Sequence, residues 1–202
     1  SGSKFTTIQR GDSVTDLSLA EAAVLPVATT DSRKWRWLLL SLAVLVADQW
    51  SKWQVELHLP QHVSRTLVPG MLSLTHVRNT GVAFGLFASG GELVGTLVLA
   101  GLGCLALAVV GFYFRHTPAT NRLLLGALAL VVGGAIGNLC DRIASGAVTD
   151  FVDAYWGSHH WPAFNVADSA ITVGLILMAL DALWPGRNPH PRPQPQPNPA
   201  SE

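Results

Sequence analysis

Two short stretches, Val148-Thr149-Asp150-Phe151 and Phe164-Asn165-Val166-Ala167-Asp168, decide the fold and the chemistry that this chain is expected to have. Each stretch delivers one aspartate, and the second opens a long apolar run of the length that a membrane helix needs. A carboxylate at the mouth of a membrane helix is expensive to bury, so by default it marks a functional site. We therefore predict that Asp150 and Asp168 work as a pair.

The composition places the chain among membrane proteins. Of its 202 residues, 49% are hydrophobic and 13% are charged, whereas soluble domains carry roughly 25% charged residues. Thirteen basic and thirteen acidic side chains give a formal net charge of zero. Because nucleic-acid binding relies on a surplus of basic side chains, we expect no nucleic-acid partner.

Four runs of the sequence are apolar enough to cross a bilayer, so we predict a membrane all-α fold with four transmembrane helices. The runs cover about residues 37–57, 93–114, 123–140 and 162–184. The first run is unusual because Asp48, Lys52 and Glu56 recur every four residues and share one helix face. Either this face leaves the membrane, with Lys52 paired to Asp48, or it turns into the bundle and helps to build a site.

Between the first two spans the pattern changes to short β-like pieces. Pro69-Gly70 indicates a turn, residues 71–77 alternate larger and smaller side chains, and Asn79-Thr80-Gly81 indicates a second turn. We therefore predict a small β element at this place, lying on the outer membrane surface.

Lysine and arginine side chains near the span ends set the predicted orientation, because they are enriched in cytoplasmic loops. The ends on the side of both termini carry Arg33, Lys34, Arg36, Arg115, Arg122, Arg187 and Arg192, and the opposite ends carry Lys52, Arg65, Arg78 and Arg142. Both termini are therefore predicted to be cytoplasmic, with both aspartate segments at the outer face.

The two ends of the chain have compositions that do not bury a core. Residues 1–34 are rich in Ser, Thr, Ala and Asp without a sustained apolar period, and residues 185–202 hold seven of the twelve prolines. We predict disordered cytoplasmic tails at 1–34 and at 185–202. A four-helix membrane domain is predicted between them, at residues 35–184.

Polar groups concentrate where span three approaches span four. Asn138 and Arg142 are four residues apart on one helix face, at the depth where Asp168 would enter from span four. An arginine there would hold a carboxylate ionised or orient a loop. A solvated helix end explains Asp141 and Arg142 equally well from their spacing alone.

Metal and cofactor sites are not expected. Cys104 and Cys140 lack the paired spacing of a metal or redox site. The pair His159-His160 has no zinc-site spacing around it and is interpreted as solvated.

At this point the residues form blocks that closely resemble the lipoprotein signal peptidase family, the bacterial signal peptidase II, over about residues 37–184. In order along the chain, the blocks are Asp48 with Lys52, Asn79-Thr80-Gly81-Val82-Ala83-Phe84, Gly137-Asn138-Leu139-Cys140-Asp141-Arg142, Val148-Thr149-Asp150-Phe151 and Phe164-Asn165-Val166-Ala167-Asp168. Any one block is a weak signal, whereas five in the family's order on four spans make a specific match.

The resemblance implies an aspartyl endopeptidase of the bacterial inner membrane, with a small extracytoplasmic β-cradle between spans one and two and no cofactor. Such an enzyme cuts the signal peptide just before a diacylglyceryl-modified cysteine. Its partners would be diacylglyceryl-modified prolipoproteins and membrane lipid, and it would be a monomer. Asp150 and Asp168 would be the catalytic pair, supported by Asp48 and Lys52. The substrate site would be lined by Asn79, Gly81, Asn138, Arg142 and Asn165. Thr149 stands where the family more often has an aliphatic residue.

Two close carboxylates suit hydrolysis without a metal or a covalent intermediate. Because like charges a few ångströms apart do not both ionise cheaply, one aspartate stays protonated while the other activates a water. The strongest alternative is a small ion or proton transporter that relays charge along intramembrane carboxylates. A relay needs ionisable groups spread across the membrane, whereas all the candidates except Asp181 cluster at the outer end. A purely structural scaffold leaves the polar cluster unexplained.

Overall fold

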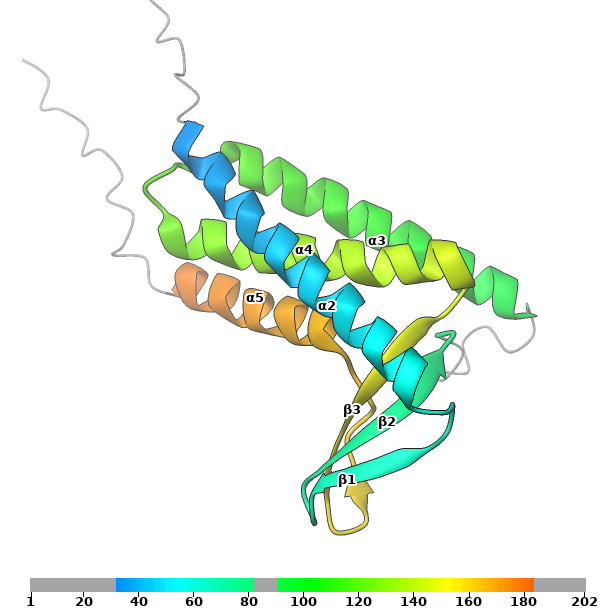
Figure 1. The fold of residues 1–202 in the computed structure, drawn as a ribbon. Helices are drawn as coiled ribbons and strands as arrows, with labels where there is room; N and C mark the ends of the chain where they lie inside the picture. Colours follow the sequence, from blue (N-terminus) through cyan, green and yellow to red (C-terminus); the bar gives the residue numbers. More distant parts are fainter. Residues whose placement is uncertain (1–31, 82–90, 184–202) are drawn as a thin grey trace, which may run out of the picture. The chain divides into compact units, whose positions relative to one another are not determined.

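The computed structural model describes residues 32–81 and 91–183. In these residues a 3₁₀ turn, η1 (Ser32–Trp37), leads into the helices α2 (Leu38–His58), α3 (Gly91–His116), α4 (Arg122–Ser145) and α5 (Val166–Leu183). The strands β1 (Ser64–Val68), β2 (Leu72–Asn79), β3 (Val148–Trp156) and β4 (His159–His160) form an antiparallel sheet in the order β1-β2-β3-β4 (Figure 1). The predicted tails lie almost entirely outside the described residues, as do residues 82–84 of the Asn79 block.

Three of the described helices are long and apolar enough to cross a membrane, namely Val94–His116, Arg122–Ser145 and Val166–Leu183. They correspond to the second, third and fourth predicted spans. The last helix begins at Val166 rather than at Pro162, because Phe164 still pairs with Val152 of β3 in an isolated β-bridge. The helix α2, which carries the charged side chains of the first predicted span, is not among the three.

The helix α2 turns its polar side chains inward and its apolar side chains outward. Ser41, Asp48 and Lys52 are buried, and Ser41 Oγ donates to the carbonyl oxygen of Ala129 on α4 at 2.8 Å. The exposed large apolar side chains of α2 are Leu38, Leu39, Leu42, Val46, Trp50, Trp53 and Leu57, and Glu56 and His58 are exposed near its C-terminal end. Asp48 and Lys52 therefore point into the bundle, which decides between the two interpretations of this pair, whereas Glu56, the third charged residue of the face, is exposed.

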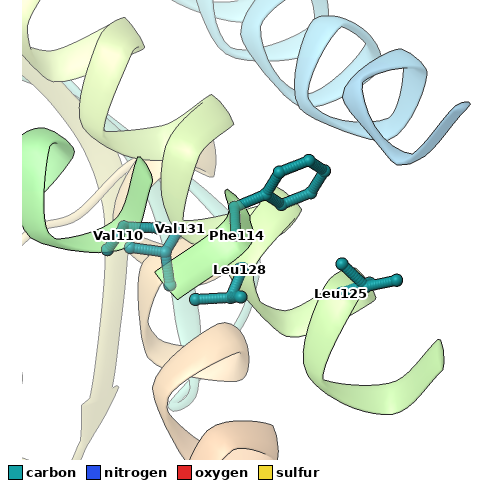
Figure 2. Close-up of a cluster of buried hydrophobic side chains, with 5 residues drawn as sticks. All are labelled: Val110, Phe114, Leu125, Leu128 and Val131. Carbon is teal, nitrogen blue, oxygen red and sulfur yellow. The ribbon is translucent and has the colours of Figure 1, made fainter. Parts of the chain in front are cut away.

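The helix α4 is the element against which α2, α3 and α5 all pack (Figure 1). Buried apolar side chains join α3 to α4 (Figure 2), namely Val110, Phe114, Leu125, Leu128 and Val131. Glycine allows the close approach of α2, because a Cβ on Gly137 would lie 2.5 Å from Oδ2 of Asp48. The glycines of α4 thus serve helix packing, as small residues commonly do between membrane helices.

The sheet draws its strands from two separate parts of the chain. β1 and β2 confirm the β element predicted between α2 and α3. The other two strands come from residues 148–160, between α4 and α5, where Asp150 lies opposite Val77 of β2. The prediction of a β element built only between spans one and two is therefore incomplete, because β3 is recruited by pairing with β2, which a local sequence pattern does not reveal.

A second apolar cluster holds β3 against the helices. Val55 and Leu59 at the end of α2 pack with Phe151 of β3, and Val166 at the start of α5 packs against them. Successive side chains of a strand point to opposite faces. Burial of Phe151 in this cluster therefore directs its neighbour Asp150 to the other face of β3.

Candidate active site

The first turn of α5 is closed by two reciprocal hydrogen bonds. The backbone N–H of Asp168 donates to Oδ1 of Asn165 at 2.9 Å, and the backbone N–H of Asn165 donates to Oδ2 of Asp168 at 3.2 Å. This is a capping-box arrangement. It places the Asp168 carboxylate in the first turn of a helix, where the helix dipole favours a negative charge.

Asp150 is fixed by two side-chain amides. Asn165 donates from Nδ2 to Oδ1 of Asp150 at 2.7 Å, and Asn79 donates from Nδ2 to Oδ2 at 3.0 Å. The orientation of the Asn79 amide is set in turn by the N–H of Gly81, which donates to Oδ1 of Asn79 at 2.9 Å. Gly81 has a φ of +79°, and a Cβ at this position would collide with Leu99. Its place in the site therefore requires glycine.

Asn165 is the residue that brings the two aspartates together. It is fully buried, and it binds Asp150 through its side-chain nitrogen and Asp168 through its side-chain oxygen and backbone N–H. The negative charge of Asp168 acts on Asp150. The predicted pair is thus assembled around one asparagine, Asn165. The family resemblance implied that this residue lines the substrate site.

Burial dominates the electrostatics of Asp150, whose exposed fraction is 2%. It raises the pKa of Asp150 to about 6, and the charge of Asp168 acts in the same direction. The hydrogen bonds from Asn79 and Asn165 and the charge of Lys52 act in the opposite direction. Asp150 therefore keeps its proton well into the weakly acidic range.

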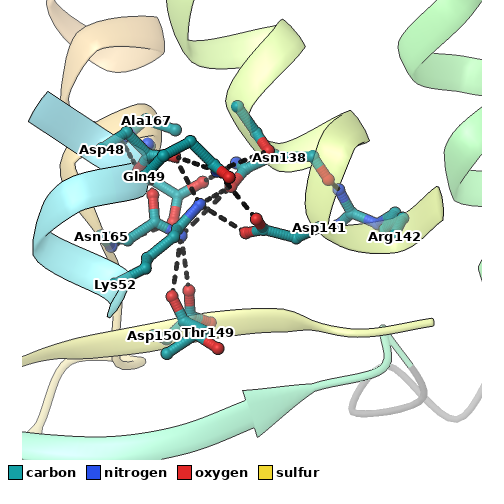
Figure 3. Close-up of polar contacts among 12 residues, drawn as sticks. Asp48, Gln49, Lys52, Asn138, Asp141, Arg142, Thr149, Asp150, Asn165 and Ala167 are labelled. Carbon is teal, nitrogen blue, oxygen red and sulfur yellow. Dashed lines mark hydrogen bonds and ion pairs between the residues drawn. The ribbon is translucent and has the colours of Figure 1, made fainter. Parts of the chain in front are cut away.

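Lys52 and Asp48 form a buried ion pair close to Asn138 (Figure 3). Lys52 Nζ lies 2.7 Å from Oδ2 of Asp48, one helical turn away. Lys52 also donates to Oδ1 of Asn138 at 3.0 Å, and Oδ1 of Asp48 accepts the backbone N–H of Ala167 at 2.9 Å. The pair therefore links α2 to both α4 and the start of α5.

Asn138 and Arg142 lie on the face of α4 that approaches α5, as their spacing predicted. Asn138 Nδ2 donates to Oδ1 of Asp168 at 2.7 Å. Arg142 donates from Nη1 to the backbone carbonyl of Asn138 at 3.2 Å and lies within electrostatic range of Asp141, Asp150 and Asp168. Asn138 thus contacts Asp168 directly, whereas Arg142 contacts the backbone of Asn138.

The structure adds residues that the sequence analysis did not place in the site. The spacing of Asp141 was explained equally well by a solvated helix end. In the structure its Oδ2 lies 2.6 Å from Nζ of Lys52. Gln49 donates from Nε2 to Oδ1 of Asp141 at 2.8 Å. Asp141 follows Asn138 by three residues, so the helical spacing contained a signal for this contact, whereas nothing in the sequence marked Gln49.

A protein with apolar helices and a buried carboxylate cluster at their ends belongs to the class of membrane-embedded proteins, and two bridged aspartates are suited to acid–base chemistry. A family model described as signal peptidase (SPase) II matches residues 40–184. The chain belongs to this family and is therefore an enzyme, an aspartic-type peptidase.

Individual relatives agree with this assignment. The lipoprotein signal peptidase of Pseudomonas fluorescens is 46% identical over 154 residues, which cover 75% of this chain and 90% of the relative. That of Geobacter metallireducens is 45% identical over 139 residues, covering 69% and 85%. A bacterial membrane enzyme solved by the in meso method at 2.3 Å resolution is also similar in structure, with a TM-score of 0.66 at 26% identity, covering 78% of this chain and 93% of that one.

Proposed function

We propose that the chain removes the signal peptide from diacylglyceryl-modified bacterial prolipoproteins, cutting just before the lipidated cysteine, with Asp150 and Asp168 as the catalytic dyad. The observation that carries the proposal is that both aspartates are bound to the buried Asn165. Membership of the signal peptidase II family supports the reaction. Substrate would contact the groups around the dyad, namely Asn79, Gly81, Asn138, Arg142 and Asn165.

The two aspartates take different roles in this proposal. Asp150 holds the shared proton, because burial raises its pKa to about 6. Asp168 is the general base, because it lies in the first turn of α5, where the helix dipole favours a negative charge, and accepts N–H groups from Asn138 and Asn165. The apparent pKa values of such a coupled pair belong to the pair as a whole.

Hydrolysis then involves two proton transfers in each step, one through Asp168 and one through Asp150. Asp168 takes a proton from a water whose oxygen attacks the scissile carbonyl carbon, while Asp150 donates its proton to the carbonyl oxygen. In the second step the C–N bond breaks, the leaving nitrogen takes the proton held by Asp168, and one hydroxyl of the tetrahedral intermediate returns a proton to Asp150. Both aspartates end in their starting protonation states.

The proposal includes α2 as a fourth transmembrane helix. Asp48 and Lys52 are buried against α4 and α5, while the large side chains exposed along most of its length are apolar, which suits a helix surrounded by lipid. Trp37 and Trp53 are separated by 16 residues of sequence, or about 24 Å of helix at 1.5 Å per residue, and tryptophan is enriched at membrane interfaces. The spacing approaches the roughly 30 Å thickness of the hydrocarbon core.

The sheet is proposed to lie at the outer surface of the bacterial inner membrane, as an extracytoplasmic cradle beside the dyad. Its far end exposes Met71, Trp156 and Trp161, with exposed fractions of 66%, 86% and 69%. These side chains surround an apolar hollow at the β1–β2 and β3–β4 turns. Exposed tryptophans suit the headgroup region of a bilayer. The acyl chains of the substrate would remain in the bilayer while its peptide bond reaches the dyad.

The test is an in vitro cleavage assay with a diacylglyceryl-modified prolipoprotein and the full chain, which we expect to act as a monomer. Asp150→Asn and Asp168→Asn should each abolish turnover while the protein still folds and binds lipidated peptide. The matched controls Asp153→Asn and Asp181→Asn should retain most activity, because Asp153 pairs with His160 and Asp181 accepts from Asn121, both away from the dyad. Wild-type turnover in either dyad variant would overturn the assignment.

A further inference from the structure

We propose that Asp141 is a positioning residue for Asp168 and acts through Lys52. The inference rests on the proposed function of the dyad and adds a residue to its machinery. Asp141 touches neither aspartate of the dyad by a hydrogen bond in the described part of the chain, so its effect on the reaction is indirect.

The ammonium group of Lys52 has three acceptors around it (Figure 3). Nζ lies 2.7 Å from Oδ2 of Asp48, 3.0 Å from Oδ1 of Asn138 and 2.6 Å from Oδ2 of Asp141. A lysine has three N–H donors, and Lys52 is only 3% exposed. Lys52 thus donates hydrogen bonds to Asp48 and Asn138 and forms an ion pair with Asp141, so its charge is neutralised while it is shielded from water.

Asp141 is held ready for this contact from its other side. Its Oδ1 accepts from Nε2 of Gln49 at 2.8 Å, and Gln49 also donates to Oδ2 of Asp48 at 3.2 Å. The buried Oδ2 of Asp141 has the ion pair with Lys52 as its contact. Asp141 and Gln49 thus set the position of the ammonium group between α2 and α4.

Two routes lead from Lys52 to Asp168. In the first, Lys52 donates to Oδ1 of Asn138, which turns the amide so that Nδ2 donates to Oδ1 of Asp168 at 2.7 Å. In the second, Lys52 holds Asp48, whose Oδ1 accepts the backbone N–H of Ala167 at 2.9 Å, one residue before Asp168. Both routes end on Asp168 or on the backbone beside it.

Loss of the Asp141 charge would leave Lys52 drawn towards Asp48 alone. Its donation to Asn138 would then weaken, and the Asn138 amide would lose one of the two contacts to Oδ1 that orient it towards Asp168, the other being the donation from Asn165 Nδ2 at 3.2 Å. A displacement of about 1 Å at a reacting group can lower a rate by about 100-fold. Of the proposed substrate contacts only Asn138 would be disturbed, so the effect is expected mainly in kcat rather than in KM.

The experiment compares Asp141→Asn with the wild-type chain in the prolipoprotein cleavage assay. We expect kcat to fall by about 10- to 100-fold, with KM within about 2-fold and lipidated-peptide binding retained. Asp141→Glu, which keeps the charge, should recover part of kcat. Asp153→Asn is the matched control, since Asp153 forms an ion pair with His160 at 2.9 Å in the β3–β4 hairpin.

A purely structural role for Asp141 would give a different pattern. It would lower the unfolding temperature in detergent but leave kcat unchanged well below that temperature. In that case Asp141→Glu and Asp141→Asn would have the same kcat. Wild-type kcat in folded Asp141→Asn would overturn the inference. If Asp141→Asn does not fold, Gln49→Met decides, because it removes the brace on Asp141 without changing a charge, and it should lower kcat by about 3- to 10-fold. A folded Gln49→Met with wild-type kcat would then reject the proposal.

Failure of this inference is distinguishable from failure of the proposed function. If Asp150→Asn and Asp168→Asn are inactive while Asp141→Asn and Gln49→Met have wild-type kcat, only the role of Asp141 is rejected. If a dyad variant turns over substrate as the wild type does, the proposed catalytic pair itself is wrong.

Discussion

Asn79 donates from Nδ2 to Oδ2 of Asp150 at 3.0 Å, across the pair of strands β2 and β3. This hydrogen bond lowers the pKa of Asp150 against the larger effect of burial. It also depends on the turn at Gly81, whose N–H holds the other end of the same amide. The turn after β2 therefore influences the protonation of an aspartate on another strand.

Replacement of Asn79 by leucine should consequently raise the pKa of Asp150 further. The limb of the pH–activity profile at which Asp150 loses its proton should move to higher pH, and turnover should fall because the carboxyl loses one of its two orienting amides. The measurement is kcat/KM for prolipoprotein cleavage between pH 5 and 9. A limb that stays in place in the variant would contradict the assignment of this limb to Asp150.

The raised pKa of Asp150 also makes a prediction about stability. A carboxyl whose pKa is higher in the folded state binds its proton more tightly there, so folding is favoured at low pH and this stabilisation is lost as pH rises through about 6. A rise of about two pKa units corresponds to roughly 3 kcal/mol. Asp150→Asn removes the titration, so its unfolding temperature in detergent should fall less between pH 4 and pH 8 than that of the wild type. Parallel curves for the two proteins would refute the prediction.

Gly137→Ala should disturb the site through packing alone. The added Cβ would lie 2.5 Å from Oδ2 of Asp48, so Asp48 would have to move away from Lys52 and Ala167. We expect a lower unfolding temperature and lower turnover, since overpacking commonly costs about 1–3 kcal/mol. Gly103→Ala on α3 is the matched control, because its Cβ would meet only Leu139 at an ordinary 3.9 Å. Equal behaviour of the two variants would count against the role given to Gly137.

The exposed tryptophans of the sheet should lie at the bilayer surface. A spin label on Trp156→Cys, in a chain whose Cys104 and Cys140 are replaced by serine, should be more accessible to oxygen than to a water-soluble nickel chelate in nanodiscs. A label on Arg65→Cys of β1 serves as the comparison and should favour the nickel chelate. The proposed position of the sheet fails if the label at 156 reports bulk water as strongly as the label at 65.

The charge bias of the loops predicts the orientation in the membrane. Reporter fusions at residue 20 and residue 195 should be cytoplasmic, and a reporter at Ser158 in the β3–β4 turn should be outside. Ser158 in the cytoplasm would remove the access of the dyad to translocated substrate.

Much of the site could be predicted from local sequence because its chemistry is carried by short blocks. Asp150 and Asp168 stood out as carboxylates next to apolar runs, and the four-residue spacing of Asn138 and Arg142 placed both on one face of a helix. The turn at Asn79-Thr80-Gly81 was also predictable, since glycine commonly occupies positions of positive φ. Three of the predicted spans were also predictable locally, because the length and apolar composition of a membrane helix are properties of one continuous segment.

The contacts that make these residues one site were not predictable, because they join residues far apart in the chain. Local spacing left open whether Lys52 faces solvent or the bundle, and only the packing of α2 against α4 and α5 turns it inward beside Asp141. Likewise no strand was predicted at β3, because its partner is β2 rather than a neighbouring segment. The sequence by itself determined which residues are candidates for the chemistry and which segments are apolar. Tertiary structure decided that Asn165 holds both aspartates, since burial and hydrogen-bond geometry exist only once the helices have packed.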